Sequence, residues 1–75
     1  MNNVPQGFIE VTCLNDGKRA LIRTELICAV YEYGAQDINY GHKPAHTCID
    51  YDDNKSVDVA EDIETVAEKM YFSEL

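Results

Sequence analysis

Apolar and polar residues alternate along the first part of the chain, which predicts two short strands joined by a tight turn. Residues 7–14 read GFIEVTCL and residues 19–23 read RALIR, and both segments show this two-residue period. Between them lie Asp16 and Gly17, a pair that supplies the positive φ angles of a hairpin turn. The following side chains are predicted to point inward: Ile9, Val11, Cys13, Ala20 and Ile22.

The alternation breaks at TELI, residues 24–27, where we expect a single helical turn. The hydroxyl of Thr24 can cap such a turn, and Leu26 would then enter the core. Residues 28–33, CAVYEY, are β-branched and aromatic enough to form a third strand. Residues 34–45 contain two glycines and a proline, so they predict a long loop.

The second half of the chain predicts another hairpin followed by a helix. Residues 45–51, AHTCIDY, and 56–60, SVDVA, alternate as strands around the turn DDNK at 52–55. A helix is predicted over 62–72, with Asp62 accepting hydrogen bonds from the amides of the first turn. Its apolar stripe has helical spacing and consists of Ile63, Val66, Ala67 and Met70.

Together these elements predict an α+β, mainly β fold: a five-stranded antiparallel sheet, curled into a small open barrel, with the C-terminal helix packed on it. The order is ββ, a helical turn, βββ, then α, in one domain over residues 1–75 with an N-terminal tail at 1–7. The predicted core consists of Ile9, Val11, Ile22, Leu26, Val30, Ile49, Val57, Val59, Ile63, Val66 and Met70.

The chain is strongly acidic, and this restricts its partners. Its formal net charge is −8, and residues 50–75 carry most of the excess of acidic side chains. Binding to nucleic acid or to anionic membranes requires basic residues, so we expect neither. A partner protein with a basic surface fits this charge. A 75-residue chain also buries only a small core, and we therefore expect a homodimer or a higher oligomer.

The compartment is expected to be the cytoplasm. No apolar run approaches the ~20 residues of a membrane-spanning helix, and residues 1–10 lack the pattern of a secretory signal. The three cysteines are an odd number and include no CxxC pair, which fits small buried apolar side chains in a reducing environment.

Two groups of residues raise the alternative of a metal-responsive binding protein. Residues 50–61 partly match a calcium loop, although Lys55 occupies the position of its invariant glycine and Pro44 interrupts any entering helix. The candidate calcium ligands are Asp50, Asp52, Asn54, Asp58 and Glu61. The candidate zinc ligands are His42, His46 and Cys48, whose spacing matches no zinc finger.

No residues suggest catalysis or a resident cofactor. The chain has no glycine-rich phosphate loop, and Cys48 with His46 has no evident third member to orient a nucleophile and base. We therefore expect a non-enzymatic protein that holds no cofactor. Aromatic side chains provide its candidate contact surface, because tyrosine is common in interface hot spots. The residues of this predicted surface are Tyr31, Tyr33, Tyr51, Tyr71 and Phe72.

Two longer stretches resemble the small flagellar-operon proteins of the FlbD family. They are FIEVTCLNDGKRALIRTELICAVYEY, from residue 8, and TCIDYDDNKSVDVAEDIETVAEKM, from residue 47. The resemblance implies the same succession of strands, turns and acid-started helix, and a non-enzymatic bacterial cytoplasmic protein of flagellar assembly or motility. The function we expect is a small protein-interaction or accessory module, linked to motility or of an uncharacterised bacterial or phage type.

Overall fold

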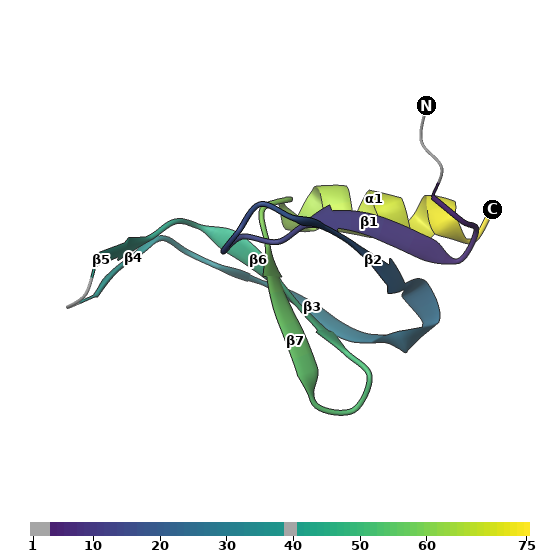
Figure 1. Cartoon of the computed structure of the whole chain (residues 1–75), viewed down its shortest axis with the longest axis horizontal. Helices are drawn as coiled ribbons and strands as arrows, with labels where there is room; N and C mark the ends of the chain where they lie inside the picture. Colours follow the sequence, from purple (N-terminus) through teal and green to yellow (C-terminus); the bar gives the residue numbers. More distant parts are fainter. Residues whose placement is uncertain (1–3, 39–40) are drawn as a thin grey trace.

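The chain folds as expected into an α+β, mainly β domain with its C-terminal helix packed on a sheet (Figure 1). The computed structural model describes residues 4–38 and 41–75, with only the backbone at 36–38, 42 and 43. Its elements are β1 (Phe8–Thr12), β2 (Arg19–Arg23), the 3₁₀ turn η1 (Thr24–Leu26), β3 (Ile27–Tyr33), β4 (Gln36–Ile38), β5 (Gly41–Lys43), β6 (His46–Tyr51), β7 (Lys55–Val59) and α1 (Ile63–Ser73).

The first hairpin forms as predicted, with β1 and β2 antiparallel and Ile9 opposite Ile22. Its turn is fixed by a hydrogen bond from the Lys18 amide to Asp16 Oδ1, at 3.0 Å. Gly17 has φ of 72°, which a residue with a Cβ rarely adopts. Asp16 does not share this conformation, so Gly17 alone supplies the positive φ of this turn.

The prediction of one five-stranded curled sheet is wrong, because the five main strands divide into two sheets. β1 pairs with β2, and β3, β6 and β7 form a separate sheet in the order β3-β6-β7. In the described part of the chain, the two sheets meet at a single bridge between Cys13 and Val59. Next to this bridge the Thr12 carbonyl accepts from the Ala60 amide, while the Thr12 amide donates to the side chain of Glu61. The pairing of β1 with β7 ends there, and no barrel closes.

The long loop predicted over 34–45 contains strands β4 and β5, which pair with each other. They continue the register of β3 and β6, because Tyr33 lies opposite His46 and Gln36 lies opposite Lys43 three residues further along. Gly34 and Pro44 lie at the two breaks of this ribbon, whereas Gly41 is part of β5. Pro44 lacks the N–H group that a continuous ladder would need. Figure 1 shows this ribbon projecting from the body of the molecule.

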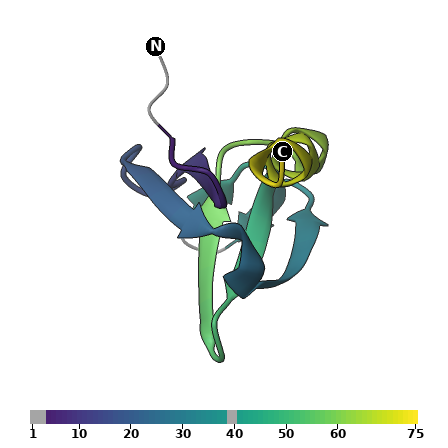
Figure 2. The ribbon, with the colours of Figure 1, turned by 90° about the vertical axis from the view of Figure 1, so that its right-hand side faces the viewer.

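The core lies between the two sheets and the helix, and the pattern of apolar residues predicted most of it (Figure 2). The buried cluster consists of Ile9, Val11, Ile22, Ile49, Val59 and Val66, all of which were predicted. The predicted residues Val30, Val57 and Met70 lie half-buried at its margin, and Ile63 is half-buried. Ala67 is exposed, although the helical stripe placed it on the apolar face.

Leu26 was predicted to fill the core, and this is wrong: its side chain is 41% exposed. The 3₁₀ turn instead directs Thr24 inward, where its hydroxyl lies 2.7 Å from that of Ser73. The Ser73 hydroxyl donates to the Met70 carbonyl, so Thr24 is the donor of the bond between the two hydroxyls. Thr24 therefore ties η1 to the end of α1 and does not cap its own turn.

The helix runs from Ile63 to Ser73, shifted by one residue from the predicted 62–72, and Asp62 caps its first turn as predicted. The Thr65 amide donates to Asp62 Oδ1 at 2.8 Å, and this hydrogen bond lowers the pKa of the Asp62 carboxyl. At the other end, the Gly7 amide donates to the Ser73 carbonyl at 3.0 Å, so the last residue of the expected N-terminal tail is attached to the helix. No helix in the described ranges is long and apolar enough to span a bilayer.

Candidate functional site

The outer face of the β3-β6-β7 sheet, turned away from the core, carries the most organised group of exposed aromatic side chains. Directly opposite residues of antiparallel strands share a face. Tyr31 lies opposite Cys48, and Tyr33 lies opposite His46. Cys48 in turn lies opposite Asp58 on β7. The alternation of three strands therefore gathers two tyrosines, a histidine, a cysteine and an aspartate, which we call the tyrosine face, together with Asp50 of β6.

Tyr31 and Tyr33 are held in fixed orientations, although 36% and 41% of their surfaces are exposed. The Tyr31 hydroxyl donates to Asp50 Oδ2 at 2.7 Å. This hydrogen bond, assisted by partial desolvation, raises the pKa of the Tyr31 phenol above its ordinary value. The ring of Tyr33 packs edge-on against Tyr31, with centroids 5.6 Å apart, and stacks on His46 at 5.3 Å. Each ring therefore has a polar or aromatic neighbour that restricts its rotamers.

His46 lies buried beneath this aromatic pair and supports Tyr33. Its Nδ1 lies 2.9 Å from the Pro44 carbonyl, which can only accept, so Nδ1 carries a proton. Its Nε2 lies 3.4 Å from Asp58 Oδ1 but has no hydrogen-bond partner among the residues that the structure describes. The ring is thus oriented by one hydrogen bond and by stacking, with a carboxylate beside its second nitrogen.

Cys48 is buried next to His46 and is poorly suited to nucleophilic chemistry. Burial is the largest influence on its thiol and raises the thiol pKa; the neighbouring acids Asp58 and Asp50 act in the same direction, and Tyr31 opposes them. The thiolate is the nucleophilic form of cysteine, and these surroundings disfavour it. The physical setting of Cys48 is that of a small side chain packed beneath Tyr31.

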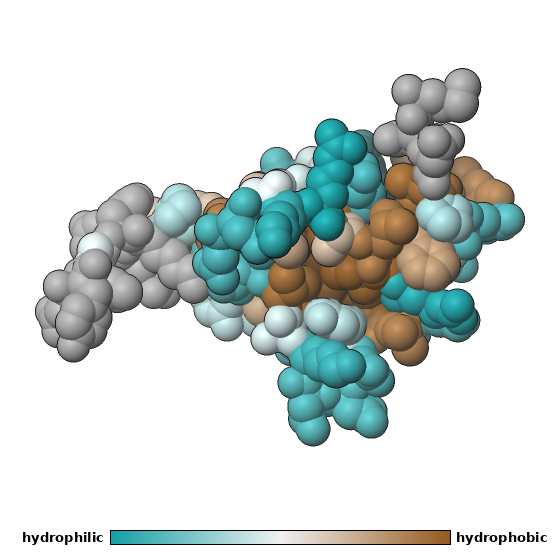
Figure 3. All heavy atoms as spheres, viewed as in Figure 1, coloured by the Kyte–Doolittle hydropathy of each residue, from teal (hydrophilic) through white to brown (hydrophobic). Residues whose placement is uncertain are grey.

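The structure does not bring the five candidate calcium ligands together. Asp50 accepts the hydrogen bond of Tyr31, and Asp52 forms an ion pair with Lys55 at 3.6 Å. Asn54 is exposed in the turn between β6 and β7, and Asp58 lies on the tyrosine face. That turn forms a hydrophilic projection in Figure 3. The positions that match a calcium loop in sequence are therefore spread over a hairpin.

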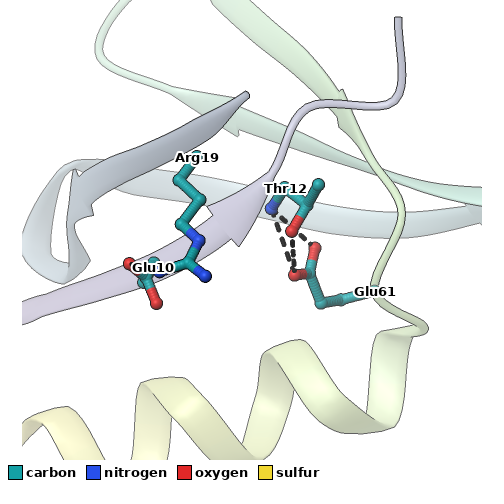
Figure 4. Close-up of polar contacts among 4 residues, drawn as sticks. All are labelled: Glu10, Thr12, Arg19 and Glu61. Atoms are coloured by element: carbon teal, nitrogen blue, oxygen red, sulfur yellow. Dashed lines mark hydrogen bonds and ion pairs between the residues drawn. The ribbon is translucent and has the colours of Figure 1, made fainter. Parts of the chain in front are cut away.

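Glu61 is also committed elsewhere (Figure 4). Its carboxylate accepts hydrogen bonds from the Thr12 amide at 2.9 and 3.1 Å and from the Thr12 hydroxyl at 3.0 Å. Among the side chains that the structure describes, no three from His, Cys, Asp or Glu are arranged to hold a metal ion. A calcium-responsive function would require these groups to move, and an unchanged melting curve at millimolar calcium would exclude it.

The candidate zinc ligands are only partly described. His46 and Cys48 are neighbours on one face of β6, but the contacts of each are those given above. The side chain of His42 lies outside the described residues. Of the three candidate zinc ligands, the described side chains therefore place only His46 and Cys48 close together.

The five predicted contact residues fall in three separate places. Tyr31 and Tyr33 form the tyrosine face, as the strand period indicated. Tyr51 lies opposite Ile27 and packs at the margin of the core, apart from these two tyrosines. Tyr71 and Phe72 form an edge-on pair near the end of α1, with exposed fractions of 65% and 62%.

The residues that sequence reasoning missed are the supports of the tyrosine face. His46 was considered as a zinc ligand, and Asp50 and Asp58 as calcium ligands, but none as a partner of a tyrosine. The alternation of HTCIDY at 46–51 contained the signal, since it places His46, Cys48 and Asp50 on one face. Only the register against β3 shows which tyrosine each of them meets.

Comparisons with protein-family models, with curated proteins and with solved structures found no match for this chain. The resemblance to the FlbD family therefore stays a prediction.

Proposed function

We propose that this protein is a small, non-enzymatic binding module that contacts a partner protein through its tyrosine face. The observation that carries the proposal is that Tyr31 and Tyr33 are exposed and yet fixed, one by Asp50 and the other by His46. Isolated exposed apolar residues are common, but two adjoining aromatic rings with organised support are typical of a contact site.

The physical advantage of this arrangement is entropic. A side chain that is free in solution loses rotamer freedom when a partner immobilises it, at a cost of about 0.5–1.5 kcal/mol. Tyr31 and Tyr33 lose less rotamer freedom on binding, because intramolecular contacts already restrict their side chains. A tyrosine also has an apolar ring and a hydroxyl group, so it suits a surface that is exposed to water in the free protein and buried in a complex.

The charge of the molecule defines the partner further. Asp50 and Asp58 border the two rings, and the whole chain has a net charge of −8. A basic surface is therefore attracted to this face, and its association rate should fall as salt rises. The resemblance to the FlbD family adds a specific expectation, that the partner belongs to the flagellar export or motor apparatus. Self-association into a homodimer or higher oligomer is the remaining expectation.

The test is a crosslinked pull-down of the tagged protein from its native cells, with identification of the recovered proteins by mass spectrometry. The double variant Tyr31→Ser/Tyr33→Ser is compared with a control, Leu21→Ser/Tyr71→Ser. The control removes two side chains that are 51% and 65% exposed on other elements. Thermal melts establish that both variants are folded.

The expected result is a partner recovered by the wild type and the control but lost from the tyrosine variant. Its binding is then reproduced with purified proteins at two salt concentrations. Flagellar components would support the family resemblance. Recovery of only the protein itself would point to self-assembly, and equal recovery by both variants would exclude the tyrosine face.

A further inference from the structure

A second surface lies along the edge of β1 that faces the helix. The backbone groups of β1 alternate between its two edges, and two hydrogen bonds show which residues face which edge. The Cys13 amide donates to the Lys18 carbonyl on the β2 side, at 2.8 Å. The Thr12 amide donates to the carboxylate of Glu61 on the opposite side. Since neighbours alternate, the backbone N–H and C=O of Glu10 also point away from β2.

The two ends of this edge are occupied, but its centre is open. Glu61 accepts from the Thr12 amide at one end, and the Phe8 amide donates to the Pro5 carbonyl at the other. Between these points, the N–H and C=O of Glu10 and the C=O of Phe8 have no hydrogen-bond partner in the described part of the chain. Unpaired groups on a strand edge are a template for another strand.

This open edge borders a groove of about 540 Å³ between β1, α1 and the N-terminal segment. The apolar side chains lining it include Val4, Pro5, Phe8, Phe72 and Leu75. Phe72 and Leu75 are largely exposed, and Figure 3 shows apolar surface at this end of the molecule. Backbone hydrogen-bonding groups beside an apolar channel are the two elements by which proteins recognise extended peptides.

The charges of the groove and of the whole chain indicate the sign of its occupant. Glu10 pairs with Arg19 at 3.6 Å, as Figure 4 shows. Glu68, on α1, lines the groove and has no ion-pair partner among the described residues. Lys69 is the one basic residue among the described residues that line it, and it too has no ion-pair partner among them. The lining itself is therefore nearly balanced, and it is the net charge of −8 on the whole chain that favours a basic occupant, with Glu68 as the acid available to pair with it.

We propose that this groove binds a short extended segment of a partner protein, apolar and basic in alternation, as an added strand on β1. The Glu10 amide donates to a carbonyl of the segment, and the carbonyls of Glu10 and Phe8 accept from its amides. Alternate side chains of the segment enter the apolar lining, and a basic side chain pairs with Glu68. This surface does not use Tyr31 or Tyr33, so the proposal is independent of the tyrosine face.

A second copy of the chain fits this edge less well than a basic segment. Antiparallel pairing of two β1 strands about Glu10 would place Glu10 opposite its own equivalent, and like charges directly opposite each other are destabilising. Two molecules with a net charge of −8 also repel each other at low salt. The short length of the open edge, limited by Glu61 and Pro5, further favours a narrow peptide over a whole strand pair.

The test uses two synthetic nine-residue peptides in ¹H–¹⁵N NMR titrations of the intact chain. One peptide alternates valine with lysine, and the other alternates valine with glutamate. The lysine peptide is expected to shift the amide resonances of Glu10 and Phe72, and to slow hydrogen exchange at Glu10. Inverting the peptide charge should weaken binding by roughly tenfold.

Variants of the protein separate the roles of backbone and charge. Glu10→Pro removes the N–H group without breaking the ladder to β2, whereas Glu10→Gln keeps it. Glu10→Pro and Glu68→Lys should each weaken binding of the lysine peptide by roughly tenfold relative to Glu10→Gln and the wild type. Asp53→Lys, an equal charge change in the exposed β6–β7 turn, is the control and should bind nearly as the wild type does.

Several results would overturn the proposal. They are equal binding of both peptides, equal binding by Glu10→Pro and Glu10→Gln, resonance shifts confined to the tyrosine face, or no shift at millimolar peptide. If Glu10→Pro does not fold, exchange protection of the Glu10 amide in the wild type decides the question. Loss of peptide binding in Glu68→Lys with the tyrosine pull-down unchanged would separate this surface from the proposed function.

Discussion

Strand β6 presents Thr47 and Ile49 to the core and His46 and Cys48 to the outer face, and all four side chains are buried. The inner pair is buried by other elements, namely the β1-β2 sheet and α1. The outer pair is covered by Tyr31 and Tyr33 of the neighbouring strand, which remain partly exposed themselves.

The difference shows that burial has two origins in this small sheet. On the inner face it contributes to the hydrophobic core that stabilises the fold. On the outer face, burial of β6 side chains results from the aromatic rings of β3, which lie over them and form the surface. A substitution on the inner face should therefore alter the free energy of unfolding most, and one on the outer face should mainly alter the surface.

The largest effect is expected for Ile49→Ala. Ile49 is fully buried, and truncation of such a side chain leaves a cavity that costs about 2–5 kcal/mol of unfolding free energy. Urea denaturation followed by circular dichroism measures the change. Cys48→Ala, one position away on the outer face, is the matched variant and should cost clearly less. Equal losses would mean that the two faces contribute alike to stability.

A smaller effect of opposite sign is expected for Thr47→Val. The Thr47 side chain is 1% exposed, and its hydroxyl has no hydrogen-bond partner among the described residues. Valine has nearly the same shape, so it should raise the unfolding free energy by about 1 kcal/mol. Thr12→Val is the control, because that hydroxyl donates to Glu61, and its removal should lower stability by about 1 kcal/mol. A loss in both variants would show that the Thr47 hydroxyl is satisfied in solution.

The inner face was largely predictable from sequence, because a two-residue period identifies which side of a strand is apolar. The same rule misplaced Leu26, since a 3₁₀ turn does not follow the strand period and the bond from Thr24 to Ser73 depends on the far end of the chain. The division of the strands into two sheets could not be predicted from the sequence either. At the point where β1 and β7 stop pairing, Glu61 binds the Thr12 amide, and this contact joins residues 49 positions apart.

The outer face was predicted only in part, for a related reason. The period placed Tyr31 and Tyr33 together, but it could not show that Asp50 and His46 fix them. Those contacts depend on the register between β3 and β6, which is not encoded in either strand alone. Strands β4 and β5 share that register. The glycines and the proline of residues 34–45 led instead to the prediction of a loop.

Tyr31→Phe tests the outer face through pH. The bond to Asp50 raises the pKa of the Tyr31 phenol, so the folded state holds its proton more tightly than the unfolded state. The resulting stabilisation is fully present below the ordinary phenol pKa of about 10 and is lost as pH rises toward the folded-state value. The wild type should therefore lose stability between pH 9 and 11 more steeply than Tyr31→Phe, as measured by urea melts at each pH. Tyr33→Phe is the control, and the same slope in wild type and Tyr31→Phe would exclude the effect.

The last prediction concerns the rates at which the cysteine thiols react, and it involves the smallest change in stability. Cys28 is exposed, whereas Cys48 is buried opposite Tyr31 and its thiol pKa is raised by that burial. In a Cys13→Ser background, which removes the half-buried third thiol, a thiol reagent at neutral pH should therefore modify Cys28 quickly and Cys48 slowly, and a further Cys28→Ser change should abolish the fast phase. Tyr31→Ser should then accelerate the slow phase while the melting temperature changes little. Ile49→Ala is the control for global stability. If the rate of the slow phase rises in Ile49→Ala but not in Tyr31→Ser, Cys48 reacts only when the whole protein unfolds, and the tyrosines do not protect it.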